Sequence, residues 1–244
     1  MSEATQHAAE ARRTELATAL ASVRDRIKAA CESAGRDPAE ITLVVVTKFF
    51  PASDVLLLHE LGVRAIGENK DQEAGAKIAA VRAALRGDAG PELHFVGRLQ
   101  SNKARHVAGY ADVVHSVDRV KLLRGLSAGA MERGRPLSVL IQVSLDGDTG
   151  RGGALPADVP RLAAAVVDRA GLVLKGVMAI APMEADPDDS FALLREVASG
   201  IRALHPGAHW VSAGMSGDLE AAIRHGATHL RVGTAILGSR PSLL

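Results

Sequence analysis

The chain has 244 residues, 47% of them hydrophobic, and its formal net charge at pH 7 is +1. This length accommodates one large core and is close to the roughly 250 residues typical of a single (β/α)8 barrel. Aromatic residues make up only 2% of the chain, and acidic and basic residues are interspersed along it. Nucleic-acid-binding proteins need stacking surfaces and a basic face, so the composition excludes a nucleic-acid partner. We expect a single domain that spans residues 1–244.

The first residues are polar and include acids, and they lack the apolar stretch of a signal peptide. No apolar run reaches the roughly 18 residues that span a bilayer. Cys31 is the only cysteine, so an intrachain disulfide cannot form and a reducing compartment is favoured. We therefore expect a cytoplasmic protein without a membrane partner, in which Cys31 packs against the core. We also expect a monomer.

A long helix is predicted first, over residues 9–34, because Leu16, Leu20, Val23 and Ile27 recur at three- and four-residue spacing. Short apolar strands and helices then alternate about eight times. The strands are predicted at 41–48, 63–66, 93–96, 111–115, 137–143, 173–180, 209–211 and 229–232, and the helices at 53–61, 69–85, 101–108, 118–132, 157–170, 189–204 and 217–225. Strands that are joined through helices must be parallel.

Two parallel architectures are compatible with this alternation, an open doubly wound sheet and a closed barrel. The open sheet often carries a glycine-rich phosphate-binding turn after its first strand, and neither G-x-G-x-x-G nor G-x-x-x-x-G-K-[ST] occurs here. Eight repeats in a domain of this length favour a closed (β/α)8 TIM barrel, preceded by an extra N-terminal helix.

The first predicted strand, ITLVVVTK (41–48), ends on a lysine. Side chains alternate between the two faces of a strand, so Val44, Val46 and Lys48 share one face, with Lys48 at the carboxyl end. That end is where parallel α/β folds assemble their chemistry. A partly desolvated amine there favours its neutral, nucleophilic form and can form an imine with an aldehyde. The alternative is a lysine that extends from the strand into water.

A closed barrel brings its last strand beside its first, so the stretch HLRVGT (229–234) becomes a neighbour of Lys48. His229, Arg231 and Gly233 then share one face of the last strand. Gly233 lets a backbone N–H approach an anion, and Thr234 adds a hydroxyl. The loops after strands seven and eight are the usual phosphate site of this fold.

The loop after strand seven, Ser212 to Asp218, is small, polar and rich in glycine, and a helix is predicted to open at about Ser216. A helix N-terminus offers free N–H groups to an anion. Ser216 could instead serve only as a helix cap. Two such loops at the phosphate end of the barrel favour a ligand that carries phosphate.

An amine, an arginine and a phosphate cradle together fit a phosphorylated aldehyde, of which pyridoxal 5′-phosphate (PLP) is the obvious example. Its aldehyde would form an imine with Lys48, and Arg231 would face its ring nitrogen. Arginine can only donate hydrogen bonds, so it would keep that nitrogen unprotonated and leave the ring a poor electron sink.

Five stretches of the chain resemble the pyridoxal phosphate homeostasis proteins, the YggS/PROSC group. They are VVVTK (44–48), IGENKDQE (66–73), HFVGRLQSNK (94–103), GVMAIAP (176–182) and VSAGMSGDLEAAIRHGATHLRVGTAILG (211–238). The resemblance runs from about residue 35 to residue 238. It implies the barrel of the alanine racemase N-terminal domain, with PLP bound as an imine to Lys48.

The resemblance also implies which other residues line the cofactor: Asn69, Ser212, Ser216, Arg231, Gly233 and Thr234. Members of the family have no settled catalytic reaction and are regarded as buffering or delivering PLP, with apo forms of PLP-dependent enzymes as acceptors. The chain departs from the family at Thr47, where serine is usual, at Phe49-Phe50, which replace a more polar pair, and at Lys70. These positions lie at the rim, so they bear on access and release.

Two enzymatic functions are the alternatives. A PLP-dependent amino-acid racemase needs a second acid/base opposite the lysine, which is a tyrosine in alanine racemase. The only tyrosine here, Tyr110, precedes strand four and so lies at the wrong end of the strand for this role. A Schiff-base aldolase needs carboxylates beside the lysine, and the sequence shows no paired acids near Lys48. We therefore rank PLP homeostasis first, the racemase second and the aldolase last.

No metal site is predicted. The nine histidines contain no H-E-x-x-H motif, and the stretch that starts at Asp146 has Ala157 where an EF-hand loop needs glutamate. The 144–154 loop is expected to be flexible and to act as a lid. His94 is interpreted as a hydrogen-bonded histidine of the barrel. Ser101 could cap the next helix, and the resemblance favours a role of its loop, residues 100–103, in handling the cofactor or a partner.

Overall fold

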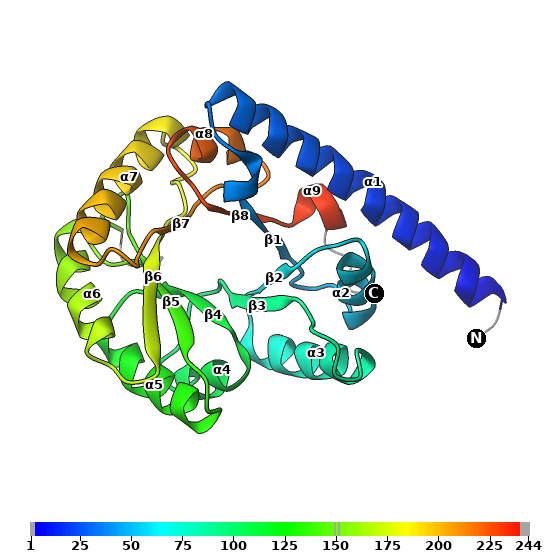
Figure 1. Cartoon of the computed structure of the whole chain (residues 1–244), viewed down its shortest axis with the longest axis horizontal. Helices are drawn as coiled ribbons and strands as arrows, with labels where there is room; N and C mark the ends of the chain where they lie inside the picture. Colours follow the sequence, from blue (N-terminus) through cyan, green and yellow to red (C-terminus); the bar gives the residue numbers. More distant parts are fainter. Residues whose placement is uncertain (1–2, 149, 151, 240–244) are drawn as a thin grey trace.

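The computed structural model describes residues 3–148, 150 and 152–239. Parallel strands form a closed barrel, each paired with the next one along the chain and the last with the first (Figure 1). The predicted TIM barrel is confirmed. The strands are β1 (Thr42–Val46), β2 (Ala65–Glu68), β3 (Glu92–Phe95), β4 (Val113–Val117), β5 (Leu137–Gln142), β6 (Leu172–Met178), β7 (Trp210–Ser212) and β8 (His229–Val232).

Helices connect the strands and surround the barrel (Figure 1). They are α1 (Glu3–Ser33), α2 (Ala52–Glu60), α3 (Asp71–Ala84), α4 (Ala104–Tyr110), α5 (Leu123–Glu132), α6 (Val159–Val167), α7 (Pro187–Leu204), α8 (Leu219–Arg224) and α9 (Thr234–Leu237), with the short 3-10 helices η1 (Pro38–Glu40), η2 (Val120–Leu122) and η4 (Pro156–Asp158). Each predicted element is present.

Three boundaries differ from the prediction for identifiable reasons. Helix α1 begins before residue 9, because Glu3 to Ala8 are mostly helix formers although they carry no apolar stripe. The predicted helix 118–132 is divided into η2 and α5. Strand β1 ends at Val46 rather than at Lys48, because the chain turns there: the Phe50 amide donates to the Thr47 carbonyl, and Phe49 has a φ of +70°.

The core has an outer apolar layer and a largely polar interior. The outer layer lies between the strands and the surrounding helices and is continuous around the barrel. Inside, the apolar cluster consists of Val113, Leu140 and Met178, with Trp210 packed against it. Buried histidines, a serine and an arginine also lie inside the barrel.

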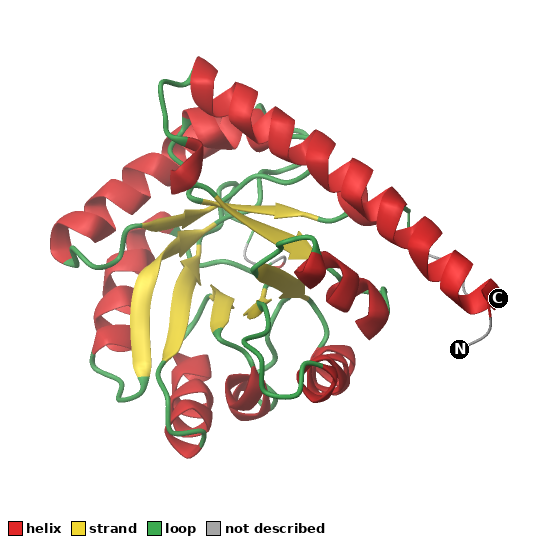
Figure 2. Cartoon of the chain, turned by 45° about the vertical axis from the view of Figure 1, so that its right-hand side comes forward, coloured by secondary structure: helices red, strands yellow, loops and turns green. Residues whose placement is uncertain are grey.

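Helix α1 packs across one side of the barrel, over α8, α9 and α2 (Figure 2). The predicted stripe of Leu16, Leu20, Val23 and Ile27 is buried, and so is Cys31, as expected. Polar contacts reinforce this packing: the Arg26 guanidinium donates two hydrogen bonds to the Glu220 carboxylate, and Arg12 donates to Asp54 at 2.8 Å.

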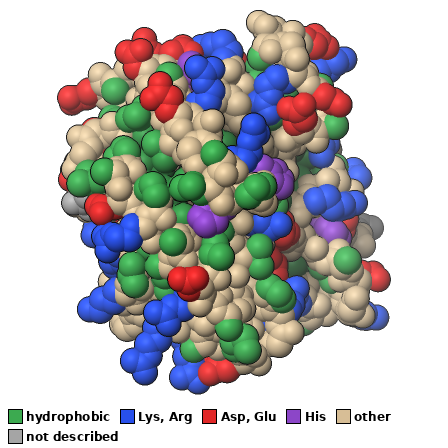
Figure 3. All heavy atoms as spheres, turned by 60° about the vertical axis from the view of Figure 1, so that its left-hand side comes forward, with side chains coloured by type: hydrophobic (Ala, Val, Ile, Leu, Met, Phe, Trp, Pro, Cys, Tyr) green, Lys and Arg blue, Asp and Glu red, His purple; other side chains and the backbone are tan. Residues whose placement is uncertain are grey.

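Among the residues that the structure describes, no helix is long and apolar enough to cross a membrane. Figure 3 shows one face of the molecule, on which acidic and basic side chains both occur.

One glycine is required where β6 and β7 approach each other. Gly176 has a φ of +149°, and a Cβ atom added to it would lie 1.9 Å from the Trp210 carbonyl oxygen. Backbone atoms cannot yield to such a contact, so a side chain here would separate the two strands.

We predict that Gly176→Ala lowers the free energy of unfolding by about 3 kcal/mol or more, because the strands must move apart. Gly200→Ala is the matched control. It lies inside α7 with nothing within 4 Å of the new Cβ, and should stabilise the helix by about 0.5–1 kcal/mol. Urea unfolding of both variants tests this, and equal midpoints would contradict the strand contact.

Candidate functional site

The lysine predicted to carry the chemistry follows β1 at the carboxyl end of the barrel. Lys48 is half-buried. The side chains of Val44 and Val46 face the interior, because Val45 between them belongs to the outer apolar layer and side chains alternate along a strand. Lys48 lies two residues after Val46, just beyond the end of β1. Its ammonium nitrogen lies 5.9 Å from the centre of the Phe49 ring.

A buried charged cluster holds the residues on both sides of Lys48. Lys77 of α3 donates to the Thr47 carbonyl oxygen at 2.8 Å, to Glu68 Oε1 at 2.7 Å and to Glu73 Oε1 at 3.1 Å. The Thr47 hydroxyl also donates to Glu68 Oε1, at 2.6 Å. Thr47 therefore retains the hydroxyl function expected at this position.

The same cluster fixes the residue after the lysine, because the Phe49 amide donates to Glu73 Oε1 at 2.6 Å. Two acids that the sequence analysis did not single out, Glu68 and Glu73, therefore hold the residues on both sides of Lys48. Glu68 lies on the face of β2 opposite to Gly67, so these carboxylates approach from the helix side and bind the flanking residues. They position Lys48 through its neighbours and supply no acid pair inside the barrel.

The ionisation of Glu68 in this cluster depends on Lys77. Glu68 is 1% exposed, and its Oε2 has no hydrogen-bond partner among the described residues. Burial raises the pKa of Glu68, and the hydrogen bond from Lys77 opposes that effect. Removing one partner of a buried ion pair leaves an uncompensated charge.

The second predicted residue, Arg231, lies in β8 beside β1. Strand β8 pairs with β1 in parallel, with Arg231 opposite Val44 and Val232 opposite Val45. The guanidinium is buried, and it donates to the Ser212 hydroxyl at 2.7 Å and to the Ala179 carbonyl at 2.8 Å. Burial lowers the pKa of Arg231 to about 10, so the group stays charged at neutral pH. Among the described residues, no carboxylate forms a salt bridge with it.

Ser212 ends β7 and is fully buried beneath Arg231 rather than exposed in the loop. Its hydroxyl oxygen lies 2.9 Å from His115 Nδ1. His115 was missed by the sequence analysis, although a histidine at an interior position of an apolar strand was a visible signal. His94, interpreted as a hydrogen-bonded barrel histidine, is confirmed as one: its Nδ1 lies 2.8 Å from His115 Nε2.

The loop after β7 has the tight geometry that its glycines predict. A Cβ on Gly214 would lie 2.7 Å from the Ala222 side chain, and the φ of Gly214 is +88°. Ser216 is half-buried, and its carbonyl accepts from Arg26 at 3.1 Å. The prediction that a helix opens at Ser216 is wrong: α8 begins at Leu219, because Met215 and Gly217 stay in the loop, where the Met215 amide is held by Asp218 Oδ1.

The loop after β8 begins next to β1. A Cβ on Gly233 would lie 3.2 Å from the Val46 carbonyl oxygen, which explains a glycine here. Thr234 follows as the first residue of α9 and is exposed. The structure therefore places Arg231 on the strand next to β1, with Gly233 and Thr234 directly after the carboxyl end of that strand.

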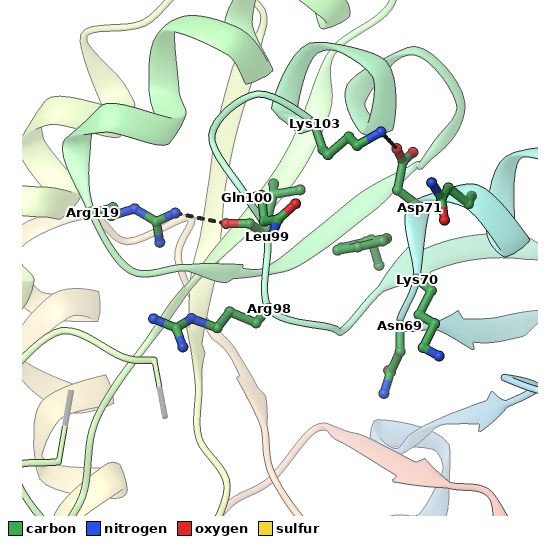
Figure 4. A pocket seen from close by; sticks show the side chains of 10 residues that line it. Asn69, Lys70, Asp71, Arg98, Leu99, Gln100, Lys103 and Arg119 are labelled. Atoms are coloured by element: carbon green, nitrogen blue, oxygen red, sulfur yellow. Dashed lines mark hydrogen bonds and ion pairs between the residues drawn. The ribbon is translucent and has the colours of Figure 1, made fainter. Parts of the chain in front are cut away.

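The remaining predicted residue, Asn69, follows β2 and lines a cavity of about 550 Å³ (Figure 4). Loops after three neighbouring strands form this cavity, which is lined by Asn69, Lys70, Asp71, Gln72, Phe95, Arg98, Leu99, Gln100, Lys103 and Arg119. Lys70 is exposed, and its amine lies 5.2 Å from the centre of the same Phe49 ring that Lys48 approaches. The cavity therefore adjoins the lysine site.

Positive charge predominates in this cavity. Lys103 Nζ lies 3.6 Å from Asp71 Oδ2, and Arg119 donates to the Leu99 carbonyl (Figure 4). Arg119 also forms an ion pair with Asp118. Arg98 donates to the Gly150 carbonyl at 2.7 Å. Ser101 does not cap α4 as predicted, because the helix begins at Ala104 and the Ser101 hydroxyl accepts from Arg119 instead.

Two other expectations concern metal binding and the loop after β5. Among the described residues, no group of histidine, cysteine and acidic side chains could hold a metal ion. The 144–154 loop is closed at its base by a bridge between Val143 and Ala154. Residues 149 and 151 lie outside the described residues, so its role as a lid stays a prediction.

Comparison with known proteins identifies the class of this barrel. Residues 18–241 match the family described as "Alanine racemase, N-terminal domain". The alanine racemase of Corynebacterium glutamicum has a similar structure, with a TM-score of 0.65, 14% identity, and coverage of 95% of this chain and 62% of the racemase. At that identity the likeness shows the fold alone. The chain is thus a barrel of the alanine racemase N-terminal type.

More similar proteins define the family. The Mycobacterium bovis protein named "Pyridoxal phosphate homeostasis protein" is 46% identical and covers 94% of both chains, and the protein of the same name in Escherichia coli K12 is 40% identical, covering 93% of this chain and 97% of its own. The solved structure of PipY from Synechococcus elongatus, with PLP bound, has 33% identity, a TM-score of 0.75, and coverage of 91% and 100%. This chain belongs to the pyridoxal phosphate homeostasis protein family.

We predict that Lys77→Met lowers the free energy of unfolding by about 3–5 kcal/mol at pH 8, because Glu68 and Glu73 lose their buried partner. Without Lys77 the pKa of Glu68 rises further, so the folded variant takes up a proton more readily as the pH falls. When folding raises the pKa of a carboxyl group, the protein loses stability as the pH rises through the range between the unfolded and the folded pKa of that group. The difference in the free energy of unfolding between Lys77→Met and the parent should therefore become smaller as the pH falls from 8 to 5.

Lys28→Met is the control for this prediction. Lys28 is an exposed residue of α1 that lies 3.9 Å from Glu32, so its loss should change stability by no more than about 1 kcal/mol. Urea unfolding at several pH values measures both variants. A Lys77→Met effect as small as that of Lys28→Met would contradict the buried cluster.

Proposed function

We propose that this protein binds PLP and acts in PLP homeostasis, as a store and donor of the cofactor rather than as an enzyme with its own substrate. The observation that carries the proposal is the pairing of β1 with β8, which sets the strand that leads to Lys48 against the strand that carries Arg231. The names of the relatives and the PLP-bound PipY structure support the same cofactor.

The side chains of the site fit this cofactor. Arg231 is a buried cation without a carboxylate partner among the described residues, and a buried charge of this kind calls for an acceptor. Lys48 supplies a half-buried amine at the same end of the barrel. When bound, PLP supplies an aldehyde that condenses with an amine, a ring nitrogen and a phosphate.

Lys48, Arg231 and the loops after β7 and β8 would hold different parts of the cofactor. Lys48 would hold the aldehyde carbon as an imine, and Arg231 would donate a hydrogen bond to the ring nitrogen. The phosphate would lie against the two loops after β7 and β8. The proposed set of lining residues is Asn69, Ser212, Ser216, Arg231, Gly233 and Thr234.

The chemistry of Arg231 favours storage over turnover. A guanidinium only donates, so the ring nitrogen beside it stays unprotonated and the ring withdraws electrons weakly. A racemase also needs a second acid/base. The only tyrosine, Tyr110, donates to Asp71 at 3.1 Å, and burial raises its pKa, so the phenol stays protonated and cannot act as the base.

Delivery of the cofactor requires that another amine reach Lys48. The basic cavity that adjoins Phe49 and contains Asn69 offers such a route, and apo forms of PLP-dependent enzymes are the acceptors that we propose. We also propose that the protein works as a monomer in the cytoplasm. The buried, unpaired Cys31 is consistent with a reducing compartment.

We predict that PLP gives the purified protein a visible absorbance band at one equivalent, and that borohydride fixes the cofactor on the peptide containing Lys48. Lys48→Ala should abolish the band. Lys70→Ala, which removes the neighbouring amine, should keep it. Stoichiometric binding with unchanged absorbance in Lys48→Ala would refute the imine assignment.

A second measurement separates storage from catalysis. The PLP-loaded protein should not interconvert L- and D-alanine above the rate of free PLP, because a guanidinium beside the ring nitrogen would leave the ring a weak electron sink. Chiral chromatography of timed samples measures this, with PLP alone as the control. Racemisation with sustained turnover, lost in Lys48→Ala, would instead support the racemase alternative.

A further inference from the structure

A line of hydrogen bonds crosses the interior of the barrel from Arg231 to its opposite end. Arg231 donates to the Ser212 hydroxyl at 2.7 Å, and Ser212 lies 2.9 Å from His115 Nδ1. His115 Nε2 then lies 2.8 Å from His94 Nδ1, and His94 Nε2 lies 3.0 Å from Glu92 Oε2. Glu92 is the first residue of β3, so the line ends at the amino end of the barrel.

The interior members of this line are excluded from water. His94, His115 and Ser212 are 0% exposed, whereas the Glu92 side chain is 45% exposed. The hydrogen bond to His94 lowers the pKa of Glu92, so this carboxyl group is ionised at neutral pH. Burial lowers the pKa of His115 well below its ordinary value, so this ring is neutral.

With a neutral His94 ring, which the NMR experiment below tests, these two ends fix the direction of every hydrogen bond between them. An ionised carboxylate only accepts, so His94 Nε2 carries a hydrogen and, in a neutral ring, His94 Nδ1 accepts. His115 must then donate from Nε2 and accept at Nδ1. The hydroxyl hydrogen of Ser212 is consequently turned towards His115, and the Ser212 oxygen is left to accept from Arg231.

The arrangement orients the guanidinium. The bond to Ser212 and the bond to the Ala179 carbonyl hold both terminal nitrogens of Arg231, which sets the plane of the group. Barrel interiors are normally filled by branched apolar side chains. A continuous polar line in their place costs desolvation free energy, and positioning a buried cation is a function that explains it.

We propose that Glu92, His94, His115 and Ser212 form a positioning relay for Arg231, which locks one tautomer in each histidine and aims the guanidinium at the mouth of the barrel. The inference rests on the proposed function in one respect, namely that Arg231 faces the PLP ring nitrogen. It also specifies Ser212: its oxygen supports Arg231, and its hydrogen is not available to the cofactor.

The relay is tested first without cofactor. Long-range proton–nitrogen NMR of the histidine rings of the PLP-free protein at pH 7.5, assigned with single histidine variants, should show both His94 and His115 as neutral rings with hydrogen on Nε2. Hydrogen on Nδ1 of His115, or a doubly protonated His94, would overturn the proposal. This result does not depend on whether PLP binds.

The second test removes the distant end of the relay. Glu92→Ala should release the tautomers of both histidines, shift the visible absorbance maximum of the PLP-loaded protein, and weaken PLP binding by up to about tenfold, the change expected for one hydrogen bond. Glu132→Ala is the control. Glu132 is a carboxylate of similar exposure at the end of α5 that pairs with Arg105, and its loss should change none of these signals.

The outcomes separate the relay from the proposed function. Unchanged tautomers and an unchanged spectrum in Glu92→Ala would overturn the relay, even if the parent binds PLP on Lys48. A parent protein without a PLP band would refute the proposed function, while the NMR test still decides the relay. His115→Phe, which interrupts the line at its centre, should reproduce the spectral shift if Glu92→Ala proves too unstable to load.

Discussion

The pairing of β1 with β8 is the contact on which the rest of the site depends. It joins the first strand of the barrel to the last, with Thr42 to Val45 opposite His229 to Val232. A shift of one residue in this register would turn Arg231 from the interior to the helix side, since side chains alternate along a strand. Gly233 permits the close approach, because a side chain there would press on the Val46 carbonyl.

Buried charge lies on both sides of the end of β1. On the helix side, Lys77 binds Glu68 and the Thr47 carbonyl, and inside the barrel Arg231 binds Ser212. Such groups are costly to bury and contribute little net stability compared with apolar side chains. The outer layer of the core supplies the apolar burial, which leaves the interior free to hold polar groups.

Much of this arrangement could be predicted from the sequence, because the relevant patterns are local. Alternation of strands and helices predicts the parallel barrel, and closure of the barrel then brings the strands of Lys48 and Arg231 together. The histidine of β3 could be interpreted as a hydrogen-bonded interior residue for the same reason. These predictions need only the periodicity of each segment and the topology that follows from it.

What could not be predicted depends on how separate elements pack. Lys77 has the sequence context of a solvated helical lysine, and only the packing of α3 against β1 and β2 makes it the buried partner of Glu68. Likewise, the sequence can indicate that His115 lies inside the barrel, but nothing local reveals that it contacts Ser212 or that Ser212 binds Arg231. Ser101 resembled a cap, but Arg119 from a different loop engages it.

A structure determined from crystals grown with PLP tests most directly the claim that Lys48 and Arg231 hold the cofactor. The account predicts continuous density from the Lys48 nitrogen to the aldehyde carbon of PLP, Arg231 within hydrogen-bond distance of the ring nitrogen, and the phosphate against the loops after β7 and β8. Density for PLP on Lys70, or bound only in the basic cavity lined by Arg98 and Lys103, would contradict it.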